Sequence, residues 1–236
     1  VAKLYESHRL YVYQSCMYVF HRLFVEVEDN VEQEGESIED IFVKVQKIFE
    51  SYHLDSIYYH LNLVFEFLKL EYYNHYKVYR QAEKYFEEVN DACANLLVNY
   101  SNFTFPAQFL VSKIERHLRN GTEAELHAEN ETVFVDYEVD PLDVPKHIIY
   151  VLYRALSCYY IDKFDEAAKM INNLLNEVSL KKYPYAQLEI KSLLALQYVL
   201  LKDYELFNQL SNSIQRQIRL FGKDSCENIM LFLKIL

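Results

Sequence analysis

Glycine and proline are both scarce in this sequence, which contains three glycines and four prolines among 236 residues. Average proteins contain ~7% glycine and ~5% proline. Sheet turns and dinucleotide-binding loops need glycine, whereas the interior of a helix disfavours both residues. The scarcity of both residues therefore argues against a sheet-rich fold and predicts an all-α protein.

Sequence motifs for catalysis or phosphate binding are also missing. The chain contains no GxGxxG, GxxxxGK[ST], HExxH or GxSxG pattern. The four cysteines are widely separated in the sequence and form no CxxC pair, so we expect buried, reduced thiols. They are Cys16, Cys93, Cys158 and Cys226. We predict no catalytic residue and no cofactor, and a protein that is not an enzyme.

The charge is strongly acidic, with a formal net charge of -11, and no run of ~18 apolar residues occurs. Nucleic acids and anionic membrane surfaces attract basic proteins, so neither is an expected partner. The chain begins at Val1 with no signal-like segment, which we interpret as a fragment of a larger, cytoplasmic protein.

Eight acidic residues and no Lys or Arg occupy positions 123–143. A solvated arm, a docking surface for a basic partner and a cation site are the alternatives for this stretch. We predict an acidic, non-helical insertion over residues 129–144. Apolar and polar residues alternate in TVFVDYEV (132–139), as in a strand, and two prolines follow it. The arm is either free or a plug over an apolar groove, and we favour the plug, formed by Val133, Val135, Tyr137 and Val139. Its removal would then cause self-association.

Helical periodicity covers almost all the rest of the chain. Ser37 and Asp40 resemble a capping box, Pro106 fits the start of a helix, and Thr122 is a candidate cap for a short helix. The predicted helices are 2–27, 37–52, 56–75, 78–98, 106–119, a short helix after 122, 146–161, 164–178, 185–201, 204–220 and 224–236.

One spacing recurs along the chain, with a period of roughly 40 residues. Ala155 and Ala195 are one period apart, and each is followed nine positions later by an aromatic residue after a turn, Phe164 and Tyr204. The same pattern extends backward at nearly equal spacings, with a small or apolar residue three positions after each residue that closes a turn. The closing residues are Tyr79, Gly121, Phe164 and Tyr204. The residues three positions later are Ala82, Ala124, Ala167 and Phe207. This periodicity predicts repeated helix pairs, and an irregular helical bundle is the alternative.

At these residues the chain resembles the tetratricopeptide-repeat (TPR) family. The best-matching unit contains Leu194, Ala195 and Tyr198 in the first helix and Tyr204 at the turn. The resemblance covers positions 56–220, but the period is longer than that of the family consensus and the consensus Trp is absent. It implies one domain over 1–236, a right-handed α-solenoid of about five antiparallel helix pairs, with an atypical first pair at 2–52 and a last helix at 224–236.

The resemblance also implies a function. Solenoids of this family bind protein or peptide segments in the groove lined by the first helix of each pair. On the predicted register, the groove residues are Phe67, Glu71, Asn74, His75, Leu152, Leu156, Tyr159 and Tyr160. We expect an interaction scaffold; the alternatives are a ligand- or peptide-responsive regulatory module attached to another domain, and packed core at these residues.

Metal binding has only weak support in the sequence. Glu71 and His75 share a helix face, as do Glu123 and His127, but neither pair has a third ligand. We therefore expect a solvated or capping role for both pairs and no metal site.

Overall fold

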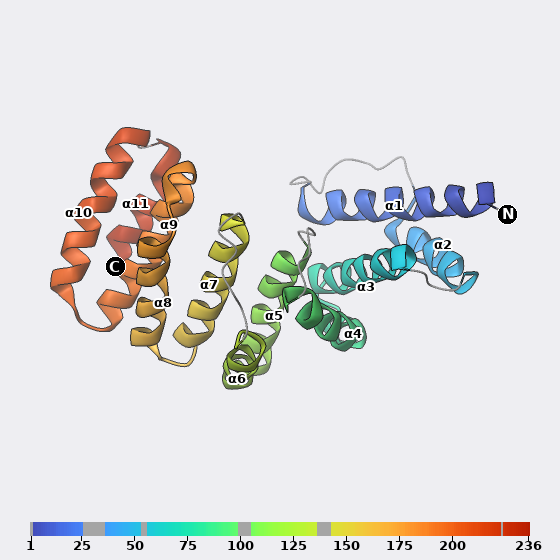
Figure 1. The fold of residues 1–236 in the computed structure, drawn as a ribbon, viewed down its shortest axis with the longest axis horizontal. Helices are drawn as coiled ribbons and strands as arrows, with labels where there is room; N and C mark the ends of the chain where they lie inside the picture. Colours follow the sequence, from blue (N-terminus) through green and yellow to red (C-terminus); the bar gives the residue numbers. More distant parts are fainter. Residues whose placement is uncertain (1, 26–35, 53–55, 99–104, 136–142, 223) are drawn as a thin grey trace. The chain divides into compact units, whose positions relative to one another are not determined.

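The computed structural model describes residues 2–25, 36–52, 56–98, 105–135, 143–222 and 224–236, with backbone only at 2, 56–58, 93–98, 105–107 and 224. Within these ranges the protein is all-α, with eleven α-helices, two short 3₁₀ turns and no strand (Figure 1). The chain divides into two compact units, residues 1–112 and 113–236, and the division falls inside helix α5. The all-α prediction is confirmed.

The first unit is built around α3. Its helices are α1 (Ala2–Phe24), α2 (Ile38–Glu50), α3 (Ser56–His75), α4 (Tyr79–Val98) and the first half of α5 (Phe105–Asn120). α3 packs against α1, α2 and α4, so nearly every side chain from Leu63 to Tyr72 is buried. This explains why apolar residues occur around the whole circumference of α3 and follow no single stripe.

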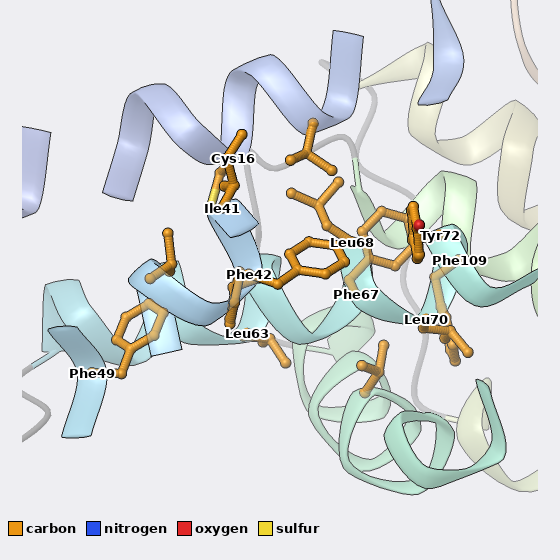
Figure 2. Close-up of a cluster of buried hydrophobic side chains, with 14 of the residues drawn as sticks. Cys16, Ile41, Phe42, Phe49, Leu63, Phe67, Leu68, Leu70, Tyr72 and Phe109 are labelled. Atoms are coloured by element: carbon orange, nitrogen blue, oxygen red, sulfur yellow. The ribbon is translucent and has the colours of Figure 1, made fainter. Parts of the chain in front are cut away.

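Aromatic rings fill much of the core of the first unit. Figure 2 shows this cluster, with Phe42 and Phe49 from α2 and Phe67 and Tyr72 from α3. The ring of Phe42 makes edge contacts with Phe65 and Tyr72 at centroid distances of 5.5 and 5.3 Å. Such edge-to-face pairs add specific geometry to the burial of apolar area. α2 buries one face of apolar side chains, namely Ile41, Phe42, Val45 and Phe49.

Most helices of the second unit pack on the next helix in the chain. After the second half of α5 come α6 (Glu123–Val133), α7 (Val144–Tyr159), α8 (Phe164–Glu177), α9 (Pro184–Leu200), α10 (Tyr204–Phe221) and α11 (Glu227–Ile235). From α6 to α10 each helix contacts its successor, and α11 packs on α9. Short connections between consecutive helices produce this order of packing.

Four turns between helices have one backbone conformation. Lys77, Gly121, Asp162 and Lys202 all have positive φ, between 58° and 67°, and recur at nearly equal intervals along the chain. In each turn the next residue donates its backbone N–H to the carbonyl five positions earlier, at 2.8 to 3.0 Å. This bond belongs to the Schellman motif, which satisfies carbonyls at the end of a helix. The turns before α4, α6, α8 and α10 are therefore alike.

Most predicted helix boundaries agree with the structure within two or three residues. The bounds of α3 are those predicted, and Ser37 begins α2 by accepting a hydrogen bond from the backbone N–H of Asp40 at 3.1 Å. Thr122 precedes α6, but its side chain makes no capping hydrogen bond. Cys16, Cys158 and Cys226 are buried free thiols, as predicted, whereas the side chain of Cys93 is outside the described residues.

The prediction of a non-helical segment over residues 129–144 is wrong at its N-terminal end. α6 continues to Val133 and α7 begins at Val144, while residues 136–142 are outside the described part of the chain. Leu126, Asn130 and Phe134 are buried at helical spacing, and Val135 is 72% exposed. The segment TVFV, which resembles a strand in its alternation of apolar and polar residues, is therefore the end of a helix. Val135 covers no groove. Tyr137 and Val139 are not described.

The predicted repeat register is wrong by two residues at Gly121. The sequence pattern aligned Gly121 with the helix-starting residues Tyr79, Phe164 and Tyr204, whereas its positive φ aligns it with Lys77, Asp162 and Lys202. Five residues after each positive-φ residue come Ala82, Leu126, Ala167 and Phe207. The first three are buried, and Ala124, which the sequence pattern had placed in this set, is exposed. The division into one repeat domain stays a prediction.

Candidate functional site

The predicted groove residues of α3 do not form one surface. Phe67 is fully buried and stacks on Phe24 at a centroid distance of 6.2 Å, and Glu71 is also buried. Asn74 is half-buried, and His75 is exposed with its ring against Tyr76 at 4.9 Å. The first two residues therefore belong to the core of the first unit, because α3 is covered on several sides.

The predicted groove residues of α7 do lie together. Leu152, Leu156, Tyr159 and Tyr160 are all half-buried, and Ile149 on the same side of the helix is 37% exposed. Positions 149, 152, 156 and 160 follow one another at helical spacing. We call Ile149, Leu152, Leu156 and Tyr160 the α7 stripe. It is a partly exposed apolar surface that no charged residue interrupts.

Aromatic contacts fix the end of this stripe. The ring of Tyr159 makes an edge contact with Tyr160 at 5.2 Å and packs against Phe164 of α8 at 5.8 Å. Partial burial raises the pKa of the Tyr160 hydroxyl, so the group stays protonated. A neutral tyrosine whose ring is held by its neighbours combines an apolar face with a hydrogen-bonding hydroxyl, which suits a protein interface.

A small pocket lies on a different face of α7, between α7 and α8. Its volume is about 210 Å³; α7 contributes His147, Tyr150 and Arg154 to its wall, and α8 contributes Met170, Asn173 and Glu177. Burial lowers the pKa of His147, while the nearby carboxylate of Glu177 opposes this shift. The imidazole is therefore mainly neutral at pH 7. Sequence reasoning missed this pocket, although His147 and Arg154 are seven residues apart on one helix face.

Arg154 is held at the edge of this pocket by the end of α6. Its guanidinium carbon lies 5.3 Å above the ring of Phe134, and its Nη2 atom is 3.9 Å from the Oε1 atom of Glu131. The Nε atom of Arg154 is buried without a hydrogen-bond partner. Glu131 is largely exposed, and such a long, solvated ion pair contributes little to stability. Arg154 therefore retains donors for an acidic or carbonyl group.

A buried cysteine and histidine also meet in this unit. The Sγ atom of Cys158 is 3.8 Å from the Nδ1 atom of His127, whose Nε2 atom is 3.2 Å from the ammonium of Lys163. Because an ammonium can only donate, the ring proton is on Nδ1 and faces the sulfur. Burial raises the pKa of Cys158 to about 11. The thiol is therefore protonated at neutral pH and is a poor nucleophile.

The described ranges also bear on metal binding and on membrane insertion. No three His, Cys, Asp or Glu side chains in those ranges lie close enough to hold a metal ion. Nor does any helix in them combine the length and the apolar character needed to cross a bilayer. No protein-family model, curated protein or solved structure gives a significant match to the chain.

Proposed function

We propose that this chain is a non-enzymatic protein-interaction module of TPR-like helical repeats, which binds a protein or peptide segment on the α7 stripe. The recurrence of one Schellman turn at Lys77, Gly121, Asp162 and Lys202 carries the repeat part of the proposal. A solenoid repeats one helix pair and one turn at a nearly constant period. The sequential packing of α6 to α10 supports the same architecture, a right-handed solenoid of about five pairs.

The binding part of the proposal depends on the chemistry of the α7 stripe. A row of leucine and isoleucine side chains that ends in tyrosine offers apolar area with a few hydrogen-bonding groups, as interface centres do. Its occupant is an apolar helix or extended segment. The protonated thiol of Cys158 supports a role without nucleophilic catalysis, because the group best placed beside a histidine is not activated.

Photo-crosslinking tests the proposed surface. A photoreactive phenylalanine analogue at position 156 should join the chain to a partner in a lysate, and Leu156→Asp should abolish retention of that partner. Lys169→Asp on the exposed side of α8 is the matched control and should retain it. Equal retention by the two variants would refute the α7 stripe as the binding surface.

Solution scattering tests the repeat architecture separately. A compact chain of this length has a radius of gyration of roughly 18 Å. An extended solenoid should exceed that value clearly, whereas a measured value near it would favour an irregular bundle.

A ligand- or peptide-responsive regulatory module is the second candidate, and the α7–α8 pocket favours it. Its volume of about 210 Å³ is below the roughly 300–1,000 Å³ of ordinary small-molecule sites, so one side chain of a peptide is the better match. Arg154 would pair with an acidic side chain. Titration with short peptides containing Glu, compared between the natural chain and Arg154→Gln, tests this role; equal binding would refute it.

A further inference from the structure

A groove between α10 and α11 has a basic rim, although the chain as a whole is acidic. Its volume is about 280 Å³, and its lining consists of Gln215, Ile218 and Arg219 from α10 and Met230, Leu233 and Lys234 from α11. The two helices both pack on α9. The groove is separate from the α7 stripe in sequence and belongs to the same unit.

The floor of the groove is apolar and its edges are positive. Ile218 is buried, Met230 and Leu233 are half-buried, and Arg219 and Lys234 are exposed. Residues 206–222 and 228–236 contain no Asp or Glu, within a chain whose net charge is -11. Neither Arg219 nor Lys234 forms an ion pair with any residue that the structure describes. Two exposed cations that form no ion pair leave positive charge available to a partner.

Exposed apolar side chains lie beside the groove on α11. Ile235 is 83% exposed and Leu231 is 50% exposed. Leu231 and Ile235 each follow a groove residue by one position, so they form the neighbouring stripe of α11. Contiguous apolar side chains with a charged rim are typical of an interaction surface.

We propose that this groove binds an acidic amphipathic segment of a partner protein. An apolar side chain of the segment occupies the floor formed by Ile218, Met230 and Leu233. Carboxylates on either side of that residue pair with Arg219 and Lys234. Charge complementarity selects this occupant, because a basic segment would be repelled and an uncharged one would leave both cations unpaired.

Selection from a library of short random peptides tests the proposal with the intact chain. Peptides retained by the natural chain and lost by the double variant Arg219→Glu, Lys234→Glu should contain Leu or Phe beside Asp or Glu. Recovery of the same peptides by both proteins, of basic peptides, or of no peptide would overturn the proposal. Circular dichroism of the double variant should match the natural chain, because both side chains are exposed.

Reversing the charges on the protein and then on one selected peptide gives a second test, with binding affinity as the measurement. The double variant should bind it at least about tenfold more weakly, and replacing its acidic residues with Lys should restore binding to the variant. Lys169→Glu on α8 makes the same type of charge change away from the groove and should leave the affinity unchanged. Leu156→Asp should also have no effect, so this result is independent of the α7 stripe. A loss of affinity with Lys169→Glu equal to that of the double variant would refute the groove.

Discussion

Lys69 and Glu66 form an ion pair inside the core of the first unit, with 2.9 Å between Nζ and Oε1 and only 10% of each side chain exposed. Lys69 also donates to the Oε1 atom of Gln46 at 2.9 Å and lies 4.2 Å from the centroid of Phe65. Burial raises the pKa of Glu66, and the ammonium of Lys69 opposes that shift. The lysine thus compensates for the burial of the carboxylate.

Loss of Lys69 should therefore be more harmful than loss of the charge on Glu66. Lys69→Met leaves a buried carboxylate without its cation, which typically costs about 3–5 kcal/mol of unfolding free energy. Glu66→Gln should cost less, because the amide oxygen can still accept a hydrogen bond and Lys69 keeps Gln46 and two aromatic rings. Urea unfolding followed by circular dichroism measures both. Equal losses would show that Gln46 and the two aromatic rings do not hold the Lys69 ammonium once the carboxylate charge is removed.

Backbone strain at the turns gives a prediction with opposite signs at two equivalent positions. Lys202→Gly should raise the unfolding free energy by up to ~1 kcal/mol, because glycine adopts positive φ without the steric cost of Cβ. Gly121→Ala should lower it by about 1 kcal/mol or more. A Cβ atom at Gly121 would meet no atom within 4 Å, so the effect reports φ alone.

Thermal unfolding of the two turn variants provides the measurement. A lower melting temperature for Lys202→Gly, or no change for Gly121→Ala, would contradict the shared turn conformation. Lys181→Gly, at an exposed position in a short 3₁₀ turn, is a control for the general effect of losing a lysine.

These turns also show how far the sequence could predict the fold. The bounds of α3 and the start of α2 were predictable, because the apolar-rich stretch of α3 stops at a turn and Ser37 is a visible cap. The register at Gly121 was not, since lysine and aspartate occupy the same positive-φ position in the other turns and give no local signal. The α7–α8 pocket was also missed, because His147 and Glu177 are far apart in the sequence and are brought together only by packing.

Close packing at Ala195 predicts a difference between two alanine variants. Ala195 of α9 is fully buried where α9 packs on its neighbours, whereas Ala128 is exposed on α6. Ala195→Leu should lower the unfolding free energy by ~1–3 kcal/mol through overpacking. Ala128→Leu should stay within about 0.5 kcal/mol of the natural chain. The melting temperatures of both variants test this, and equal values would show that Ala195 is not at a close helix contact.

The second unit should lose stability as the pH falls from 7 to 5. His117 is buried, and burial lowers its pKa below the ordinary value of about 6.5. Its Nδ1 atom is 2.8 Å from the hydroxyl and 3.1 Å from the carbonyl oxygen of Thr122; because a carbonyl only accepts, Nδ1–H donates. The unfolded chain binds the proton more readily, so the stabilisation is complete above the unfolded pKa and is lost below it.

Urea unfolding at several pH values measures this loss, and the comparison with His117→Gln isolates the residue. The variant should show a smaller fall in unfolding free energy between pH 7 and pH 5. The comparison with the variant is needed because Glu66, whose pKa is raised by burial, makes the first unit more stable as the pH falls. Parallel pH profiles for the two proteins would show that His117 does not contribute.

Phe134 and Val135 distinguish the helical end of α6 from the strand-like pattern of the sequence. Phe134 is 5% exposed, contacts the rings of Tyr150 and Tyr153 at 5.6 and 6.1 Å, and supports Arg154 from below. Phe134→Ala should lower the unfolding free energy by about 3–5 kcal/mol, because it leaves a cavity between α6 and α7. Val135→Ala should change it by less than about 0.5 kcal/mol, since that side chain is mostly in solvent.

Chemical unfolding of these two variants decides between the alternatives. If Val135 covered an apolar groove in an extended segment, Val135→Ala would be the more harmful change and Phe134→Ala would be tolerated. Phe134→Leu is a useful intermediate, because it keeps most of the apolar volume but removes the ring beneath the guanidinium of Arg154. Its loss should fall between those of the two alanine variants, since packing supplies most of the energy and the cation–π contact only about 0.5–2 kcal/mol.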